Sequence, residues 1–174
     1  MAFPTTAQLQ FVPVGPFIGA QPIHSTTTTQ NHVLGTKVRA VDVGTLGYGE
    51  GEFIYLKGVA STAAGDAVVY DAGAATTTRT VAASRGPVAI AMSANVASQY
   101  GWYQVLGETA VSTASAGTGA ANALLQTSAT AGQLTVSGTS GQKIEGAICK
   151  AAQDTPTASF TRVALHYPSA NGNT

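Results

Sequence analysis

The sequence predicts an all-β protein, a small β-barrel or sandwich of about eight to ten short strands with an extended N-terminal arm. Apolar and polar residues alternate over short runs, and glycine-rich turn signals separate these runs by about eight to twelve residues. Threonine, alanine, glycine and serine fill most other positions. No long run of leucine, glutamate, lysine and arginine indicates an extended helix.

We expect the centre of the sheet at residues 101–107, which contain the only tryptophan and have a glycine at each end. Trp102 and Tyr103 would point to opposite faces, because successive side chains alternate across a strand. A kink or bulge at Gly107 would precede a continuation of the strand through residues 108–112. The expected core residues are Trp102, Phe53 and Tyr55.

Residues 1–32 form the predicted arm. They hold four of the seven prolines, and proline removes a ladder donor and favours extended backbone. Their apolar residues are scattered anchors without a helical period. We interpret the segment as an arm that leaves the body and docks on a neighbouring subunit, with a flexible tail as the alternative. The expected contact residues are Phe3, Leu9, Phe11, Val14, Phe17 and Ile18.

Residues 33–168 form the predicted body, and residues 169–174 a polar tail. The loop at residues 44–51 is dense in glycine but lacks the lysine and the following helix of a phosphate-binding loop, so we assign its glycines to turns. Tyr48 and Glu50 are the expected contact residues of this loop. Strands of the body are predicted at residues 34–42, 52–58, 66–71, 87–94, 101–107, 123–127, 133–137, 143–150 and 159–167.

Charge is scarce. Charged residues make up 9% of the chain, and eight basic residues balance eight acidic ones. A surface with so little charge gives weak protection against association, so we expect it to be covered by copies of the chain or by another protein. The neutral balance, without a basic cluster, argues against direct binding of nucleic acid. The chain has no run of 18 apolar residues, so we expect no membrane-spanning segment.

Residues that support chemistry are few, and we expect no catalytic residue, no cofactor and no metal site. The three histidines lack metal-ligand spacing. Alternation over residues 143–150 places Ile144 and Ile148 on one face and Ala147 and Cys149 on the other, so the single cysteine is interpreted as a small buried hydrophobe. The alternatives are a Glu50–Glu52 cation site and a nucleophilic pair of Cys149 and His166 supported by Asp71 or Asp154.

Four segments resemble a family of tailed-bacteriophage structural proteins, the small head decoration (cement) proteins: GEFIYLKGVAST at residues 51–62, GDAVVYD at 65–71, PVAIAMSANVA at 87–97 and QYGWYQ at 99–104. The likeness covers residues 34–150. It implies a β-rich body, often a homotrimer, on the outer surface of the virion at three-fold positions of a shell made by a different major capsid protein. The family has no catalytic motif to transfer to this chain.

A second function class is a phage tail or fibre component that binds host-surface glycans. Aromatic rings form stacking surfaces for such ligands. The candidate rings are Trp102, Tyr103, Tyr48 and Tyr100.

Overall fold

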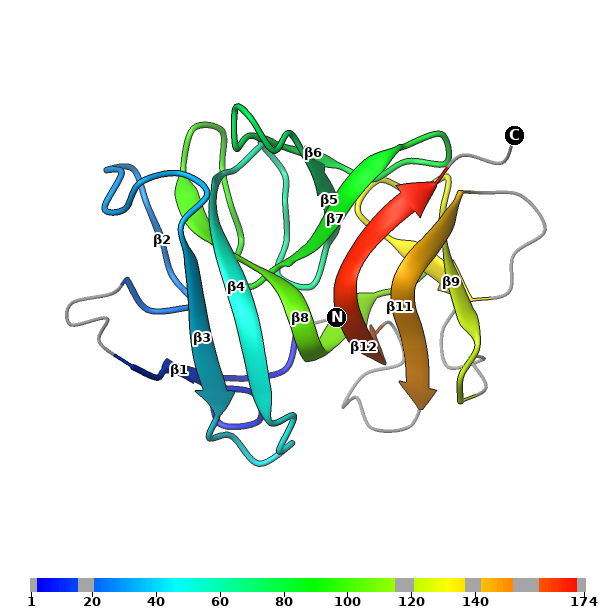
Figure 1. Ribbon diagram of the computed structural model, residues 1–174, viewed down its shortest axis with the longest axis horizontal. Helices are drawn as coiled ribbons and strands as arrows, with labels where there is room; N and C mark the ends of the chain where they lie inside the picture. The colour runs from blue at the N-terminus through cyan, green and yellow to red at the C-terminus, as the bar shows by residue number, and fades with distance from the viewer. Residues whose placement is uncertain (1–2, 16–20, 115–120, 137–141, 152–159, 172–174) are drawn as a thin grey trace.

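The computed structural model describes residues 3–15, 21–114, 121–136, 142–151 and 160–171. This part of the chain contains twelve strands and no helix. The strands form one antiparallel sheet that does not close into a barrel and is compatible with a β-sandwich. The predicted all-β class is therefore confirmed (Figure 1).

The strands follow one another along the chain with short connections. The first seven are β1 (Phe11–Pro13), β2 (Thr26–Thr27), β3 (Lys37–Asp42), β4 (Glu50–Lys57), β5 (Ala67–Tyr70), β6 (Thr77–Arg79) and β7 (Gly86–Ala91). The remaining five are β8 (Tyr100–Ser112), β9 (Leu124–Thr127), β10 (Leu134–Val136), β11 (Lys143–Ala151) and β12 (Phe160–Asn171). The first two strands, β1 and β2, lie in the segment that we expected to be an arm.

Strand β8 is the centre of the sheet, as predicted for the tryptophan-containing run. It pairs with β2, β4, β7 and β12, and its course through the middle of the molecule is visible in Figure 1. Its first half, through Leu106, lies beside β4, and its second half lies beside β12. One strand therefore joins the two halves of the sheet.

The expected kink at Gly107 is present. Gly107 has a φ of +93°, and a side-chain carbon there would collide with the backbone carbonyl of Glu50. The register between β4 and β8 shifts next to this point. The side-chain amide nitrogen of Gln104 (Nε2) donates hydrogen bonds to the backbone carbonyl oxygens of Leu106 and Glu108, each 3.0 Å long. These bonds hold the two sides of the bend together.

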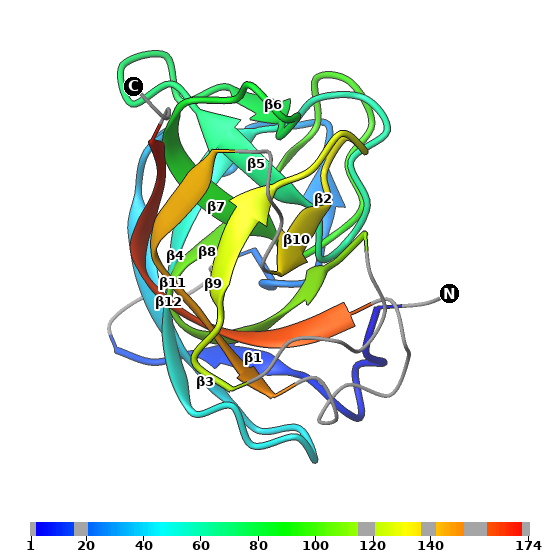
Figure 2. The ribbon, with the colours of Figure 1, turned by 90° about the vertical axis from the view of Figure 1, so that its right-hand side faces the viewer.

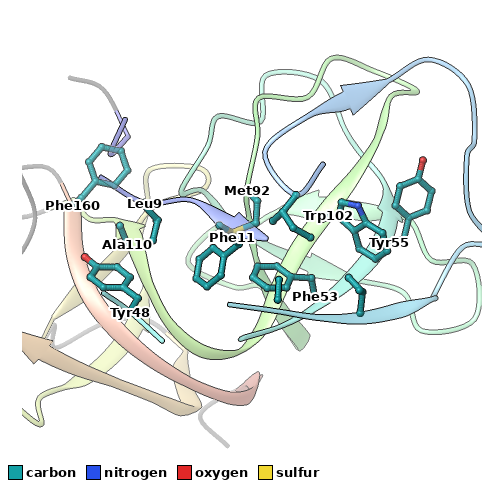
Figure 3. Packing of buried hydrophobic residues seen from close by; sticks show 12 residues of the cluster. Leu9, Phe11, Tyr48, Phe53, Tyr55, Met92, Trp102, Ala110 and Phe160 are labelled. Carbon is teal, nitrogen blue, oxygen red and sulfur yellow. The ribbon is translucent and has the colours of Figure 1, made fainter. Parts of the chain in front are cut away.

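The three residues expected in the core are fully buried. Trp102, Phe53 and Tyr55 each have an exposed fraction of 0% and belong to one aromatic cluster (Figure 3). The rings of Tyr55 and Trp102 lie 5.0 Å apart between centroids. A second apolar cluster lies among β7, β9, β10, β11 and β12.

The predicted N-terminal arm is wrong for the residues that the structure describes. Strand β1 pairs with β3, and β2 pairs with β8. Leu9 and Phe11 are 1% and 3% exposed in the core of their own chain. The Phe11 ring lies 4.8 Å from that of Phe53 (Figure 3). These anchors cover one face of the sheet, because burying them there removes apolar surface from water.

Two histidines hold this N-terminal segment in place. The Nε2 atom of His24 accepts a hydrogen bond from the Phe11 N–H (3.1 Å), while its Nδ1 atom lies 3.3 Å from the Met92 carbonyl oxygen. The Nε2 atom of His32 accepts from the Gln21 N–H (3.1 Å). The Gln21 carbonyl in turn accepts from the Trp102 indole N–H (2.9 Å), so the segment is bonded directly to the central strand.

The predicted polar tail is also partly wrong, because β12 continues through Asn171. Pro168 does not end the strand. It lies in an irregular stretch of β12 opposite Gly146, where the register with β11 shifts. Beyond it, Ser169 and Ala170 pair with both β11 and β7. A bulge therefore accommodates the proline without ending the ladder.

Candidate interaction surface

Most of the predicted contact residues do not form a common surface. Leu9 and Phe11 are buried, and Phe3 packs edge-to-face on Phe160 with a centroid distance of 5.8 Å. Val14 is 43% exposed. The last two arm residues, Phe17 and Ile18, lie outside the described residues.

In the loop at residues 44–51, Glu50 is exposed but Tyr48 is not. The Tyr48 side chain is 4% exposed, and the Arg162 guanidinium lies 4.5 Å from its ring centroid. The expectation that Tyr48 contacts a partner is therefore wrong. Glu50 faces solvent and forms an ion pair with Arg39 at 3.4 Å.

The carboxylate of Asp42 fixes the backbone of this loop. This carboxylate accepts hydrogen bonds from the backbone N–H groups of Gln10 (2.9 Å), Gly44 (2.8 Å) and Tyr48 (2.8 Å). These hydrogen bonds join the loop to the N-terminal segment and hold the backbone at Tyr48 next to the end of β3. An aspartate just before a glycine-rich loop is a typical turn-capping residue, and this was the sequence signal for an ordered loop.

A different surface carries the exposed apolar residues that are close together. On the outer face of β9, β11 and β12 lies a groove of about 450 Å³. These three strands are neighbours in the sheet and lie side by side in Figures 1 and 2. The groove's residues include Leu124, Ile148, Ala164, Lys143, Glu145 and His166.

The apolar part of the groove is a row of side chains across three strands. Ala164 on β12 pairs with Ile148 on β11, which pairs with Leu124 on β9. Leu124 and Ile148 are 57% and 42% exposed. Exposed apolar side chains that are contiguous, rather than scattered singly, are typical of contact surfaces.

A bulge at Gly146 creates this row. Gly146 has a φ of +73°, and a side-chain carbon there would collide with the His166 carbonyl. Three residues of β12, 166–168, lie opposite Gly146 alone, and the side chains of β11 change face at this glycine. As a result Ile144 is buried while Ile148 is exposed, whereas strict alternation predicted that both share one face. Ala147 and Cys149 are buried, as expected from their common face.

The irregular part of β12 opposite Gly146 also places an aromatic ring on the surface. Tyr167 has a φ of +47°, which is unusual for a residue with a side chain, and it is 50% exposed. Its hydroxyl donates to the Glu52 carboxylate (3.0 Å), and the Lys37 ammonium lies 4.6 Å from its ring centroid.

Charged residues flank the groove. The Glu108 carboxylate binds the Arg162 guanidinium and lies 3.7 Å from the Lys150 ammonium. By contrast, Lys143 and Glu145 form no ion pair within the described part of the chain. The groove thus has an apolar floor and opposite charges at its rim.

The residues of the imagined nucleophilic pair do not form a site. Cys149 is fully buried, and burial raises the pKa of its thiol, which opposes formation of the reactive thiolate. His166 is exposed at the outer groove. The Asp71 carboxylate accepts from the backbone N–H groups of Gly73 (2.7 Å) and Ala74 (2.8 Å) in a turn, and Asp154 lies outside the described residues.

Other candidate chemistry is also accounted for by structural contacts. Among the described residues, no group of three or more histidine, cysteine, aspartate or glutamate side chains is arranged to hold a metal ion. Glu50 and Glu52 bind separate cations, Arg39 and Lys37.

Three of the four aromatic residues considered for glycan stacking are buried. Trp102 and Tyr103 are 0% exposed and Tyr48 is 4% exposed, so these rings cannot stack on a ligand from solvent. Burial raises the pKa of Tyr103 to about 12, and its hydroxyl accepts a hydrogen bond from the Asn95 amide at 2.6 Å. The fourth ring, Tyr100, is half-buried and stacks on Tyr55.

Comparison with known proteins identifies no relative. No protein-family model matches the chain, and neither a curated protein nor a solved structure matches it.

In the described part of the chain, no helix is long and apolar enough to span a bilayer.

Proposed function

We propose that this protein is a structural, non-enzymatic component of a phage head: a decoration (cement) protein that binds the outer surface of the capsid and stabilises it against internal DNA pressure. Its partners would be the major capsid protein and other copies of itself, with a homotrimer as the expected oligomer. The proposal rests on the resemblance of four sequence segments and on where those segments lie in the fold.

The observation that supports the proposal most is the contiguity of these segments. Residues 51–62 contain most of β4, 65–71 contain β5, 87–97 contain most of β7, and 99–104 begin β8. In the sheet, β4 pairs with β8, β8 with β7, and β7 with β5. Segments that are separate in the sequence are therefore one continuous piece of sheet, as expected if the likeness reflects a shared body rather than unrelated short motifs.

The surface supplies a second argument. A chain with 9% charged residues and equal numbers of acids and bases has little to keep copies apart. Exposed apolar residues gather in the groove of β9, β11 and β12. Many weak contacts of this kind, repeated over a shell, resist expansion through multivalency. The exposed residues of this groove replace Leu9, Phe11 and Tyr48 as the proposed contact residues.

The proposal predicts a loss of DNA retention when the protein is missing. Particles assembled without it should release DNA at a lower temperature, or on chelation, than particles that carry it, because the contacts between capsomers are fewer. DNA release would be followed by dye fluorescence during heating. Adding the purified protein back to the depleted particles is the control and should restore the original release temperature. Equal release temperatures with and without the protein would refute the cement role.

Electron microscopy of intact particles distinguishes the head from the tail. Density for the protein on the outer shell supports decoration, whereas density confined to the tail would refute it in favour of a tail or fibre component. Because Trp102, Tyr103 and Tyr48 are buried, only the half-buried Tyr100 remains of the four rings on which glycan binding was based.

A further inference from the structure

The groove of β9, β11 and β12 has an apolar floor that a partner would cover. Ala164, Ile148 and Leu124 form a row across three strands on the outer face of the sheet. Each of the last two is more than one-third exposed. The face of a sheet has its own backbone groups already paired, so a partner gains mainly by covering side chains.

The charges at the rim indicate which partner this is. Along the outer face of β11, Lys143 and Glu145 are exposed and line the groove, so a cationic and an anionic side chain lie at one rim. Lys143 and Glu145 have no ion-pair partner within the described part of the chain. A partner that carried only one sign of charge would leave one of the two signs opposed to a like charge. A second copy of the same surface supplies both signs.

We propose that this groove is an isologous contact, at which two copies of the chain pack their β9, β11 and β12 faces together about a two-fold axis. In such a contact the same patch is used twice. The Ala164, Ile148 and Leu124 side chains of each copy cover those of the other, and Lys143 of one copy meets Glu145 of the other. The net charge of zero means that no overall repulsion opposes the pairing.

This pairing goes beyond the proposed capsid role and is tested on purified protein without particles, so either proposal can fail alone. A two-fold contact is compatible with the expected homotrimer, since it can join chains of two different trimers. Sedimentation velocity therefore measures the mass of the smallest species and the formation of larger species as the protein concentration rises.

The first test concerns the apolar row. Ile148→Lys places a charge in the middle of the contact and should raise the dissociation constant for the pairing by about tenfold or more, because a central buried contact residue dominates such interfaces. Val96→Lys is the matched control, since Val96 is 58% exposed but lies outside the groove, and it should associate like the parent. Equal association of the parent and the Ile148→Lys variant would refute the proposal.

The second test uses the rim and does not depend on the stability of a single variant. Glu145→Lys places two positive side chains, at positions 143 and 145, at this rim, and Lys143→Glu places two negative ones there. Each variant alone should remain the smallest unit, because like charges then face each other across the contact. An equimolar mixture should regain the larger species, since opposite rims meet. A misfolded variant cannot be restored in this way.

The outcomes separate the possible occupants of the groove. Self-association that is lost in each variant and regained on mixing supports the two-fold contact. A parent protein that keeps one mass at all concentrations, or a mixture that stays as small as its components, would refute it. Rim variants that keep their mass but no longer bind to depleted particles would assign the groove to the capsid instead of a second copy.

Discussion

His24 is a residue whose protonation opposes the native structure. Its Nε2 atom accepts from the Phe11 N–H, so only the neutral imidazole keeps this bond. Burial lowers the pKa of His24 below its usual value of 6.5, although the hydrogen bond to the Met92 carbonyl and the nearby charge of Asp42 act in the opposite direction. The folded state therefore binds this proton less readily than the unfolded state.

The free energy of unfolding should consequently fall as the pH drops from about 7.5 to about 5.5, where an unfolded histidine gains its proton. At higher pH both states are neutral at this site, and the effect vanishes. Chemical denaturation at the two pH values measures the change. The His24→Gln variant should show a smaller pH dependence than the parent, whereas His166→Gln, at an exposed position, should retain it. An undiminished pH dependence in His24→Gln would contradict this role.

Trp102 shows, also at the scale of the residue, how much one buried side chain contributes to the free energy of unfolding. Its ring is fully buried against Tyr55 and His32, and its indole N–H donates to the Gln21 carbonyl. Trp102→Ala should lower the free energy of unfolding by about 3–5 kcal/mol through the cavity and the lost contacts. Urea denaturation measures this loss, with Tyr167→Ala as an exposed aromatic control. A Trp102→Ala protein as stable as the parent would show that the cluster is not the core.

At the scale of the element, β8 depends on the bend at Gly107. Gly107→Ala combines two penalties: a positive φ that alanine rarely adopts, and a collision with the Glu50 carbonyl. Gly86→Ala isolates the first penalty, because Gly86 has a φ of +117° but no atom within 4 Å of its added carbon.

Thermal unfolding should therefore show a larger destabilisation for Gly107→Ala than for Gly86→Ala. The positive φ alone costs on the order of 1–3 kcal/mol in each variant. The additional loss in Gly107→Ala would come from separating β4 from β8 near the bend. Equal losses in the two variants would mean that the close approach of the two strands is not required.

The strands themselves show which elements a sequence predicts and which it does not. Alternation predicted β4, β7 and β8 because their side chains really do alternate between two covered faces. It failed on β11, since the side chains of this strand change face at Gly146, which exposes Ile148. A glycine within a strand is a recognised sign of a bulge, but the face on which the following residues emerge depends on β12, which lies elsewhere in the sequence.

At the scale of the whole molecule, the all-β class was predictable and the position of the N-terminal segment was not. Its prolines and the irregular spacing of its apolar residues give no hydrophobic period from which burial could be predicted. The burial of Leu9 and Phe11 depends on the open face of β3 and β4 and on the imidazole of His24. The groove could not be predicted from the sequence either, because its row of Ala164, Ile148 and Leu124 exists only once three strands have paired.

The integration of the N-terminal segment also has a consequence for the order of folding. Leu9 and Phe11 share one cluster with Phe160, which begins the last strand. Leu9 and Phe11 are synthesised before β12, and their cluster stays incomplete until β12 is available. Contacts between distant parts of a chain form slowly, and the apolar residues that wait for them promote aggregation. Completion of this cluster thus depends on the synthesis of β12.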